Sequence, residues 1–293
     1  MSLISLLIVM GLERLMRKSP AWHIHAIAGR YFTILQKRDL FTTQTSMFGF
    51  LLIAVIPGLI LWLLLAVSQS ALLLFLSQLL VLWVCLGCPL TRKRYKQYLQ
   101  AADRQDFEAC SLHSMGFGNK NGDLAAVPDQ LVYINYRQYA AVVIFFILLG
   151  APGVLIYSLA KELQTHLHKS ALCDASGLSE DAEISHDCVL EGQQLIIDRI
   201  MHGLDWLPVR ITGLGFLIVG HFTRALGVWL PALLDFSTPA KEVLVKVAKA
   251  SEDTPVNTQD CSSEPAILVR LVKRNILFML VALSLLTVVG AVN

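Results

Sequence analysis

The stretch DRIMHGLDWLPVR, residues 198–210, concentrates side chains that can do chemistry in a chain that is otherwise mostly apolar. Asp198, His202 and Asp205 are spaced by four and three residues, so on a helix they project toward the same side. Two carboxylates flanking an imidazole can bind a cation or a phosphate-bound Mg²⁺, or transfer a proton. These three residues are therefore the candidate metal ligands and the first candidate site. The alternative interpretation is an amphipathic surface helix with a solvated polar face.

The local periodicity predicts where this helix lies and where it ends. Pro208 disfavours helical backbone at the preceding Leu207, so we expect the helix to end there. Trp206 and Arg210 would then lie at the membrane–water boundary, where both residue types anchor well. The apolar face of the helix comprises Ile196, Ile197, Ile200, Met201 and Leu204.

Further polar residues lie next to or within apolar stretches and are candidate site residues. Glu13 follows an apolar segment and is either a functional intramembrane carboxylate or a structural partner of Arg14. Asn135 and Arg137 directly precede an apolar run, where they form either a membrane anchor or, through Arg137, an anion-binding group. His221 is either a ligand or a hydrogen-bonded structural histidine.

The composition places the chain among membrane proteins. Hydrophobic residues make up 55% and charged residues 16% of the chain, well below the roughly 25% charged residues of soluble domains. The apolar residues are gathered in uncharged runs about as long as the roughly 20 residues that cross a bilayer. The net charge of +2 gives no reason to expect a nucleic-acid partner.

These runs predict an all-α fold: one polytopic helical membrane domain over residues 1–293, with four or five transmembrane helices and interfacial amphipathic helices. The run at 211–234 is either a fifth span or a helix at the interface, because it carries His221 and Arg224. A charge at mid-membrane costs about 2.5–3.5 kcal/mol on insertion scales. The other spans are expected near 47–67, 71–88, 138–160 and 275–292.

The charged segments between the spans predict the topology. The basic segments 12–46 and 89–137 are expected in the cytoplasm, and the span at 138–160 then leads out of the cell. The acidic loop 170–192 would lie outside, where Cys173 and Cys188 form either a disulfide or two free thiols. The polar tract 250–265 is expected to be a flexible linker.

Several motifs resemble the AmpE family of bacterial inner-membrane proteins. The resemblance implies a multi-pass inner-membrane protein with a regulatory or sensory role in β-lactamase induction and cell-wall fragment signalling. It also implies the lipid bilayer, a cell-wall-derived ligand and a cytoplasmic peptidoglycan amidase as candidate partners. The motifs are LERL at 12–15, YLQAADRQD at 98–106, INYRQY at 134–139, D-x3-H-x2-DWLPVR at 198–210 and GHF followed by AL at 220–226.

A more distant similarity, carried by Asp205, Pro208 and Arg210 together with the hydropathy, is to the cobalamin-pathway CobD/CbiB membrane proteins. It implies an alternative function: a membrane ligase or transferase acting on a phosphate- or amine-bearing substrate. Arg137 and Arg210 would then bind the anion, and the carboxylates would hold Mg²⁺ with a nucleotide. Between the two functions the sequence leaves catalysis and any cofactor undecided.

Overall fold

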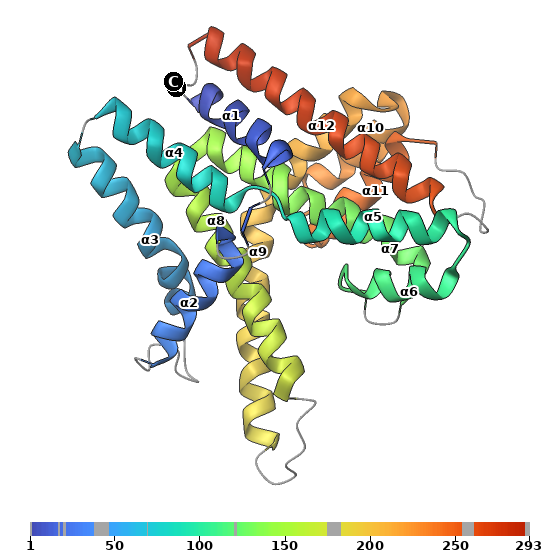
Figure 1. Cartoon of the computed structure of the whole chain (residues 1–293), viewed down its shortest axis with the longest axis horizontal. Helices are drawn as coiled ribbons and strands as arrows, with labels where there is room; N and C mark the ends of the chain where they lie inside the picture. Colours follow the sequence, from blue (N-terminus) through green and yellow to red (C-terminus); the bar gives the residue numbers. More distant parts are fainter. Residues whose placement is uncertain are drawn as a thin grey trace. The chain divides into compact units, whose positions relative to one another are not determined.

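The computed structural model describes residues 2–16, 18–19, 22–37, 47–68, 70–119, 122–174, 183–253 and 261–290. Over this part of the chain the structure is helical and contains no strand, which confirms the expected all-α class. The helices are α1 (Ser2–Leu15), α2 (Ile24–Lys37), α3 (Met47–Ser68), α4 (Ala71–Cys85), α5 (Pro89–Asp103), α6 (Phe107–Met115), η2 (Leu124–Ala126), α7 (Val127–Asn135), η3 (Tyr136–Ala140), α8 (Ala141–Asp174), α9 (Glu183–Val219), α10 (Phe222–Leu233), α11 (Ala240–Ser251) and α12 (Ser263–Val288) (Figure 1).

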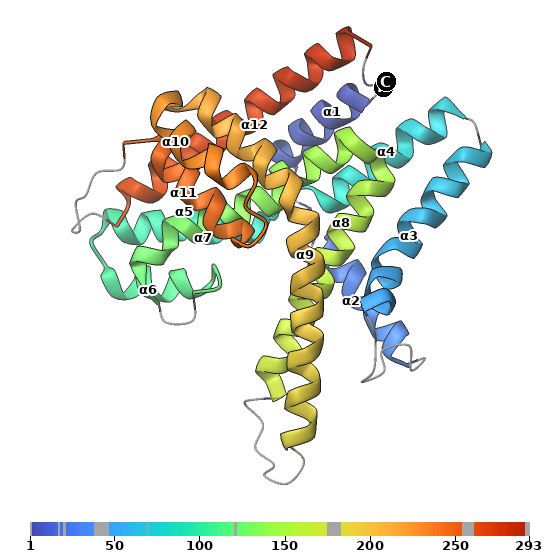
Figure 2. The same cartoon turned by 180° about the vertical axis from the view of Figure 1, so that it is seen from behind.

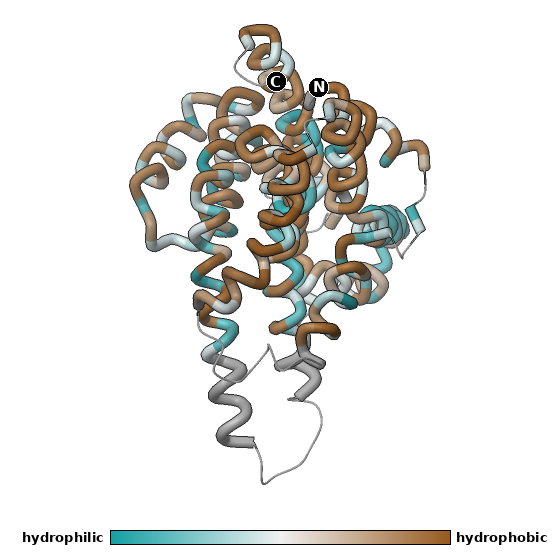
Figure 3. Tube along the Cα trace, turned by 90° about the vertical axis from the view of Figure 1, so that its left-hand side faces the viewer, coloured by the Kyte–Doolittle hydropathy of each residue, from teal (hydrophilic) through white to brown (hydrophobic). Residues whose placement is uncertain are grey.

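Within the described part of the chain, four segments are long and apolar enough to cross a membrane: Phe48–Ser68, Ala71–Asp103, Leu124–His168 and Ser263–Val288. They overlap the four spans expected near 47–67, 71–88, 138–160 and 275–292. α3 and α4 carry no charged residue and form a helical hairpin in both views (Figures 1 and 2). Hydrophobic residues dominate much of the helical trace (Figure 3).

The candidate fifth span at 211–234 is not one continuous helix, because α9 ends at Val219 and α10 starts at Phe222. The chain turns at Gly220 and His221, where the His221 N–H donates to the Ser251 carbonyl at 2.8 Å. A Cβ at Gly220 would lie 2.5 Å from the same carbonyl oxygen, so only glycine allows this approach.

The predicted helix end at Leu207 is wrong, since α9 continues through Pro208 to Val219. Proline removes one backbone hydrogen bond and crowds the preceding turn. Here the packing of Pro208, Val209 and Arg210, which are all buried, offsets the destabilisation caused by the proline. Membrane proteins tolerate prolines within helices where neighbouring elements satisfy the freed backbone groups.

α8 is interrupted at Gly150, the first residue of a Gly-Ala-Pro-Gly stretch in the middle of its apolar run. Gly150 has φ 68° and ψ −156°, and the helix is kinked there into two parts. This combination of dihedrals is essentially restricted to glycine.

The structure divides into two compact units, residues 1–85 with 145–204, and residues 86–144 with 205–293. In the first unit α1 packs on α4, where the Ser5 hydroxyl donates to Gln78 at 3.2 Å. α8 packs against α3, with Ile156 close to Gly58. The later part of α8 and the start of α9 run side by side (Figures 1 and 2), joined by a 2.7 Å hydrogen bond from Gln164 to Asp198.

The second unit is built around α7, which packs against both α11 and α12. Lys249 of α11 makes ion pairs with Asp129 of α7 at 2.7 Å and with Glu264 of α12 at 3.5 Å. A buried apolar cluster joins α5, α6, α7 and α12, and consists of Tyr98, Ala101, Cys110, Phe117, Val127, Leu131 and Val269.

Two expected loops are shorter than predicted. The acidic loop 170–192 is partly helical, since α8 extends to Asp174 and α9 begins at Glu183. The side chains of Cys173 and Cys188 lie outside the described residues, and so does 175–182. The linker expected at 250–265 is narrowed as well, because α11 runs to Ser251 and α12 starts at Ser263. Residues 254–260 lie outside the described part.

Gly150→Ala tests the break in α8. We expect the substitution to destabilise the protein by about 1–3 kcal/mol, because a side chain at this φ and ψ is strained. The matched control is Gly203→Ala in the regular part of α9, where the added Cβ meets open space. That change should instead stabilise by about 0.5–1 kcal/mol. Thermal unfolding of the detergent-solubilised proteins measures both, and an equal effect of the two substitutions would contradict the strain at Gly150.

Candidate functional site

Asp205 is the most deeply buried of the predicted site residues. Its side chain is 1% exposed, and the Tyr136 hydroxyl donates to its Oδ1 at 2.8 Å. The same hydroxyl lies 3.5 Å from the Asp205 backbone oxygen. Tyr136 is itself 1% exposed. Burying a carboxylate is costly unless hydrogen bonds or charges compensate, so this pair fixes η3 against α9 within the second unit.

Tyr136 begins a π-helical turn, η3, between α7 and α8. Such turns are rare and occur often at functional sites, because the extra residue re-aims the side chains around it. Gln138 is held on another side of the turn: its backbone oxygen accepts from Gly87 N at 3.2 Å, and its amide donates to Thr91 Oγ1 at 3.1 Å. The turn is therefore held from α9 on one side and from the start of α5 on the other.

Arg137 and the aromatic rings beside it extend this site. The rings of Tyr133 and Tyr136 are stacked with centroids 6.1 Å apart. The Arg137 guanidinium lies 5.6 Å from the Tyr133 ring centroid, a cation–π contact. The Asn135 amide donates to the Leu131 carbonyl of its own helix at 2.8 Å, a structural role. The arrangement offers a guanidinium and a phenol beside a buried carboxylate.

Arg210 is 4% exposed and closes the packing of α10 against α9. Its guanidinium donates to the backbone oxygens of Ala232, at 3.1 Å, and of Asp235. These carbonyls lie at the end of α10, where backbone acceptors lack helical partners and a cation is favourable. The indole of Trp229 donates back to the Arg210 carbonyl at 3.0 Å. The two terminal nitrogens of the guanidinium therefore have structural partners, whereas the buried Nε has no hydrogen-bond partner among the described residues.

Trp206 packs beside Arg210 at the same end of this helix pair. Its ring stacks on Phe236 with centroids 4.7 Å apart and an interplanar angle of 6°. The Arg210 guanidinium lies 4.9 Å from the Trp206 ring. Nearby, the Ser237 and Thr238 hydroxyls donate to the Asp235 carboxylate and lower its pKa well below the usual range.

Asp198 and His202 belong to the first unit, so the predicted trio does not share one solvated face. Asp198 accepts from Gln164 and lies 3.6 Å from His168 Nε2, both on α8. His202 is half-buried. Asp205, by contrast, is buried against η3. Glu13 is also in the first unit, on α1, and is 7% exposed.

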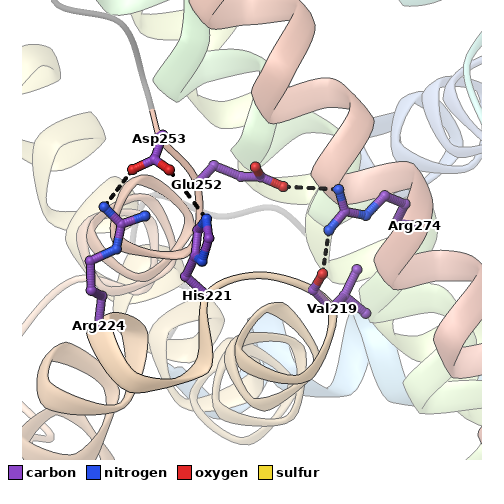
Figure 4. Close-up of polar contacts among 6 residues, drawn as sticks. All are labelled: Val219, His221, Arg224, Glu252, Asp253 and Arg274. Carbon is purple, nitrogen blue, oxygen red and sulfur yellow. Dashed lines mark hydrogen bonds and ion pairs between the residues drawn. The ribbon is translucent and has the colours of Figure 1, made fainter.

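His221 forms part of a separate polar cluster at the turn between α9 and α10. Asp253 accepts from Arg224 at 2.6 Å and lies 3.2 Å from His221 Nε2, so the two basic groups flank one carboxylate (Figure 4). Beside it, Arg274 of α12 pairs with Glu252 at 3.2 Å and donates to the Val219 carbonyl (Figure 4). The cluster pins the turn to α11 and α12.

Sequence reasoning missed two residues that complete these contacts. Tyr136 lies within the INYRQY motif, but nothing in the sequence distinguished it from the tyrosines around it. Asp253 was assigned to the flexible linker because its neighbours are polar. Among the residues that the structure describes, no three His, Cys, Asp or Glu side chains group closely enough to hold a metal ion. The expected metal ligands Asp198, His202 and Asp205 therefore form no such group.

Tyr136→Phe removes the hydroxyl that donates to Asp205. We expect the free energy of unfolding to fall by about 1–3 kcal/mol, because a buried acceptor loses a donor. Asp205→Asn should show a coupling energy with Tyr136→Phe in a double-mutant cycle measured by chemical unfolding in detergent. Tyr133→Phe is the matched control and should show no coupling with Asp205→Asn. Strict additivity of the Tyr136 and Asp205 changes would refute the contact.

The Asp253 cluster predicts a pH dependence. The hydrogen bond and charge of Arg224 lower the pKa of the Asp253 carboxyl below its ordinary value of 3.8, and His221 adds to this. A carboxyl with a lowered pKa in the folded state stabilises the protein above the unfolded-state pKa, and the stabilisation is lost as the pH falls through the folded-state value. The difference in unfolding temperature between wild type and Asp253→Asn should therefore shrink as the pH falls from about 5 to about 3. A difference that stays constant across this range, or is unaltered by Arg224→Ala, would argue against the ion pair.

Comparison with known proteins agrees with the motifs. The family described as "Regulatory signalling modulator protein AmpE" matches residues 1–293. A relative from Shigella flexneri, "Protein AmpE", is 27% identical over 308 residues, covering 99% of this chain and 99% of that protein. No solved structure matches the chain. The distant similarity to the CobD/CbiB proteins is not shown by these comparisons. The chain belongs to the AmpE family of regulatory signalling modulators.

Proposed function

We propose that this protein is a bacterial inner-membrane regulator that links the level of cell-wall fragments to β-lactamase induction. The observation that carries the proposal is the match of the AmpE family along the whole chain, residues 1–293. The membrane-spanning segments of the structure agree with a regulator that works at a membrane. No specific observation favours the ligase or transferase alternative.

In this proposal the site around Tyr136, Arg137 and Asp205 is the element that changes state. The π-helical turn is hydrogen-bonded to α9 through Tyr136 and to the start of α5 through Gln138, so a rearrangement of the turn would change its contacts with both helices. A ligand that binds one arrangement of the turn better than another shifts the population toward it. The adjoining helices α7 and α8 would then carry the change to α11, α12 and the apolar segments.

The ligand class that suits this site is an anionic fragment of the cell wall. Peptidoglycan fragments carry carboxylate groups, and a guanidinium binds carboxylates through paired hydrogen bonds. Arg137, the second residue of η3, offers this group. A cytoplasmic peptidoglycan amidase, which would deplete such fragments, is the protein partner expected to act on the same signal.

Deletion of the gene in its native host tests the proposal. We expect the deletion to change β-lactamase activity after exposure to a β-lactam, and to change the pool of cell-wall fragments measured by mass spectrometry. Wild type should restore both, Asp205→Asn and Arg137→Ala should not, and the exposed-surface control Glu242→Gln should. Immunoblots of the membrane fraction verify equal levels. Induction and pools that are the same with and without the gene would overturn the proposed function.

A further inference from the structure

We propose that α8 does not cross the membrane but enters it and returns to the same side, so that α3, α4 and α12 are the crossing helices. This topology differs from the four or five spans that hydropathy predicts. It returns the end of α8 to the side of the bilayer from which α8 enters. The contacts within each unit carry this inference separately.

The start of α8 lies at the level where α4 ends. Gln138 and Tyr139, just before α8, contact the residues that follow Cys85, the last residue of α4. The Gly87 N–H donates to the Gln138 carbonyl at 3.2 Å, and Arg92 donates to the Tyr139 hydroxyl at 3.1 Å. α8 therefore enters the membrane from the side to which the α3–α4 hairpin returns.

The middle of α8 lies at the depth of the middle of α3. An added Cβ at Gly58, about midway along α3, would lie 3.0 Å from the Pro152 carbonyl oxygen and 2.4 Å from an Ile156 side-chain carbon. These contacts come directly after the break at Gly150. The first part of α8 has thus reached about mid-membrane when the helix is interrupted.

The second part of α8 then comes back to the side on which α3 begins. Glu162 lies 2.6 Å from His25 of α2, and the His166 ring packs edge-on against Phe32 of α2 with centroids 5.5 Å apart. α2 directly precedes α3, and Tyr31 of α2 donates to the Ile53 carbonyl in the first third of α3. By residues 162–166 the chain has therefore returned to the end of the hairpin where it entered.

The break at Gly150 explains why such a path is possible. Residues 141–149 rise about 13 Å as a helix, less than half of the roughly 30 Å hydrocarbon core. Backbone that leaves the helical pattern at membrane depth is tolerated only where protein covers it. Ala151, Val154 and Tyr157, which follow the break, are buried.

The second unit gives an independent argument, which concerns whether the number of membrane crossings between α7 and α11 is even or odd. Asp129 of α7, Lys249 of α11 and Glu264 at the start of α12 form ion pairs, and Tyr98 of α5 donates to the Cys261 carbonyl at 2.8 Å. Charged groups that pair in this way lie on one side of the membrane. The chain therefore crosses an even number of times between α7 and α11, which excludes α8 as a single crossing.

If both α8 and α9 crossed, the number of crossings between α7 and α11 would also be even, but the insertion free energy would be less favourable. α9 carries Asp198, Arg199, Asp205 and Arg210. Charged side chains at mid-membrane cost about 2.5–3.5 kcal/mol each on insertion scales. The return of α8 to α2 requires no such burial. The basic segments 12–46 and 89–137 place the side from which α8 enters in the cytoplasm.

Fusions to the C-terminus of the chain test whether it crosses the membrane an odd number of times. Alkaline phosphatase joined after Asn293 should be active and green fluorescent protein at the same position dark, because three crossings place the end of α12 outside. A fluorescent fusion would mean an even number of crossings and would overturn the proposal. All six cysteines remain in these fusions, so this arm does not depend on substitutions in the chain.

Labelling with a membrane-impermeant maleimide distinguishes three crossings from five. In a cysteine-free background, Leu195→Cys on α9 should react in inverted vesicles and not in spheroplasts. The control Ser70→Cys, in the α3–α4 turn, should react in spheroplasts and not in inverted vesicles. Both positions are exposed. Labelling of Leu195→Cys in spheroplasts would show that α8 crosses and would overturn the proposal. These outcomes do not depend on β-lactamase induction, so the topology and the proposed function fail separately.

Discussion

The hydrogen bond between the Tyr136 hydroxyl and the Asp205 carboxylate joins the two halves of the second unit. These halves, residues 86–144 and 205–293, are separated by sixty residues of the first unit, from Phe145 to Leu204. The bond places the π-helical turn η3 on α9, and the turn in turn places the start of α8 and the end of α7. Because both side chains are buried, water cannot replace either partner at no cost. The pairing therefore selects one position of α9 among those that apolar packing would allow.

Other buried polar groups act in the same way along α9. Arg210 donates to the carbonyls at the end of α10, and the Asn275 amide of α12 lies 3.4 Å from the Thr212 carbonyl. Gly215 leaves the space that Asn275 occupies, since an added Cβ would collide with it. In a chain this apolar, nonspecific contacts are plentiful and discriminate poorly between alternative packings. The few buried polar residues supply the specificity.

The uncharged runs predicted the α3–α4 hairpin, the apolar part of α8 and α12, because absence of charge over about 20 residues has few explanations other than a membrane. The break in α8 coincides with the Gly-Ala-Pro-Gly stretch at 150–153, where glycine and proline are weak helix formers. The path of α9 was not predictable, since the effect of Pro208 depends on the packing around it. Asp198 and Asp205 do not share the solvated face that was expected, for a related reason. A helical wheel assumes that the helix packs against one apolar neighbour, whereas α9 contacts α8 in the first unit and η3 in the second. Tyr136 and Asp253 could not be found because their partners are distant in sequence.

Lys249 has a consequence for how this sequence can change over time. One ammonium group serves two carboxylates on two helices, Asp129 on α7 and Glu264 on α12. Loss of Lys249 would leave two half-buried carboxylates without their shared ammonium group, and loss of either acid would leave the lysine with one of these two ion pairs. Selection therefore acts on the three positions as one unit, and viable substitutions there are expected to occur in combination, although 135 residues separate the first from the last.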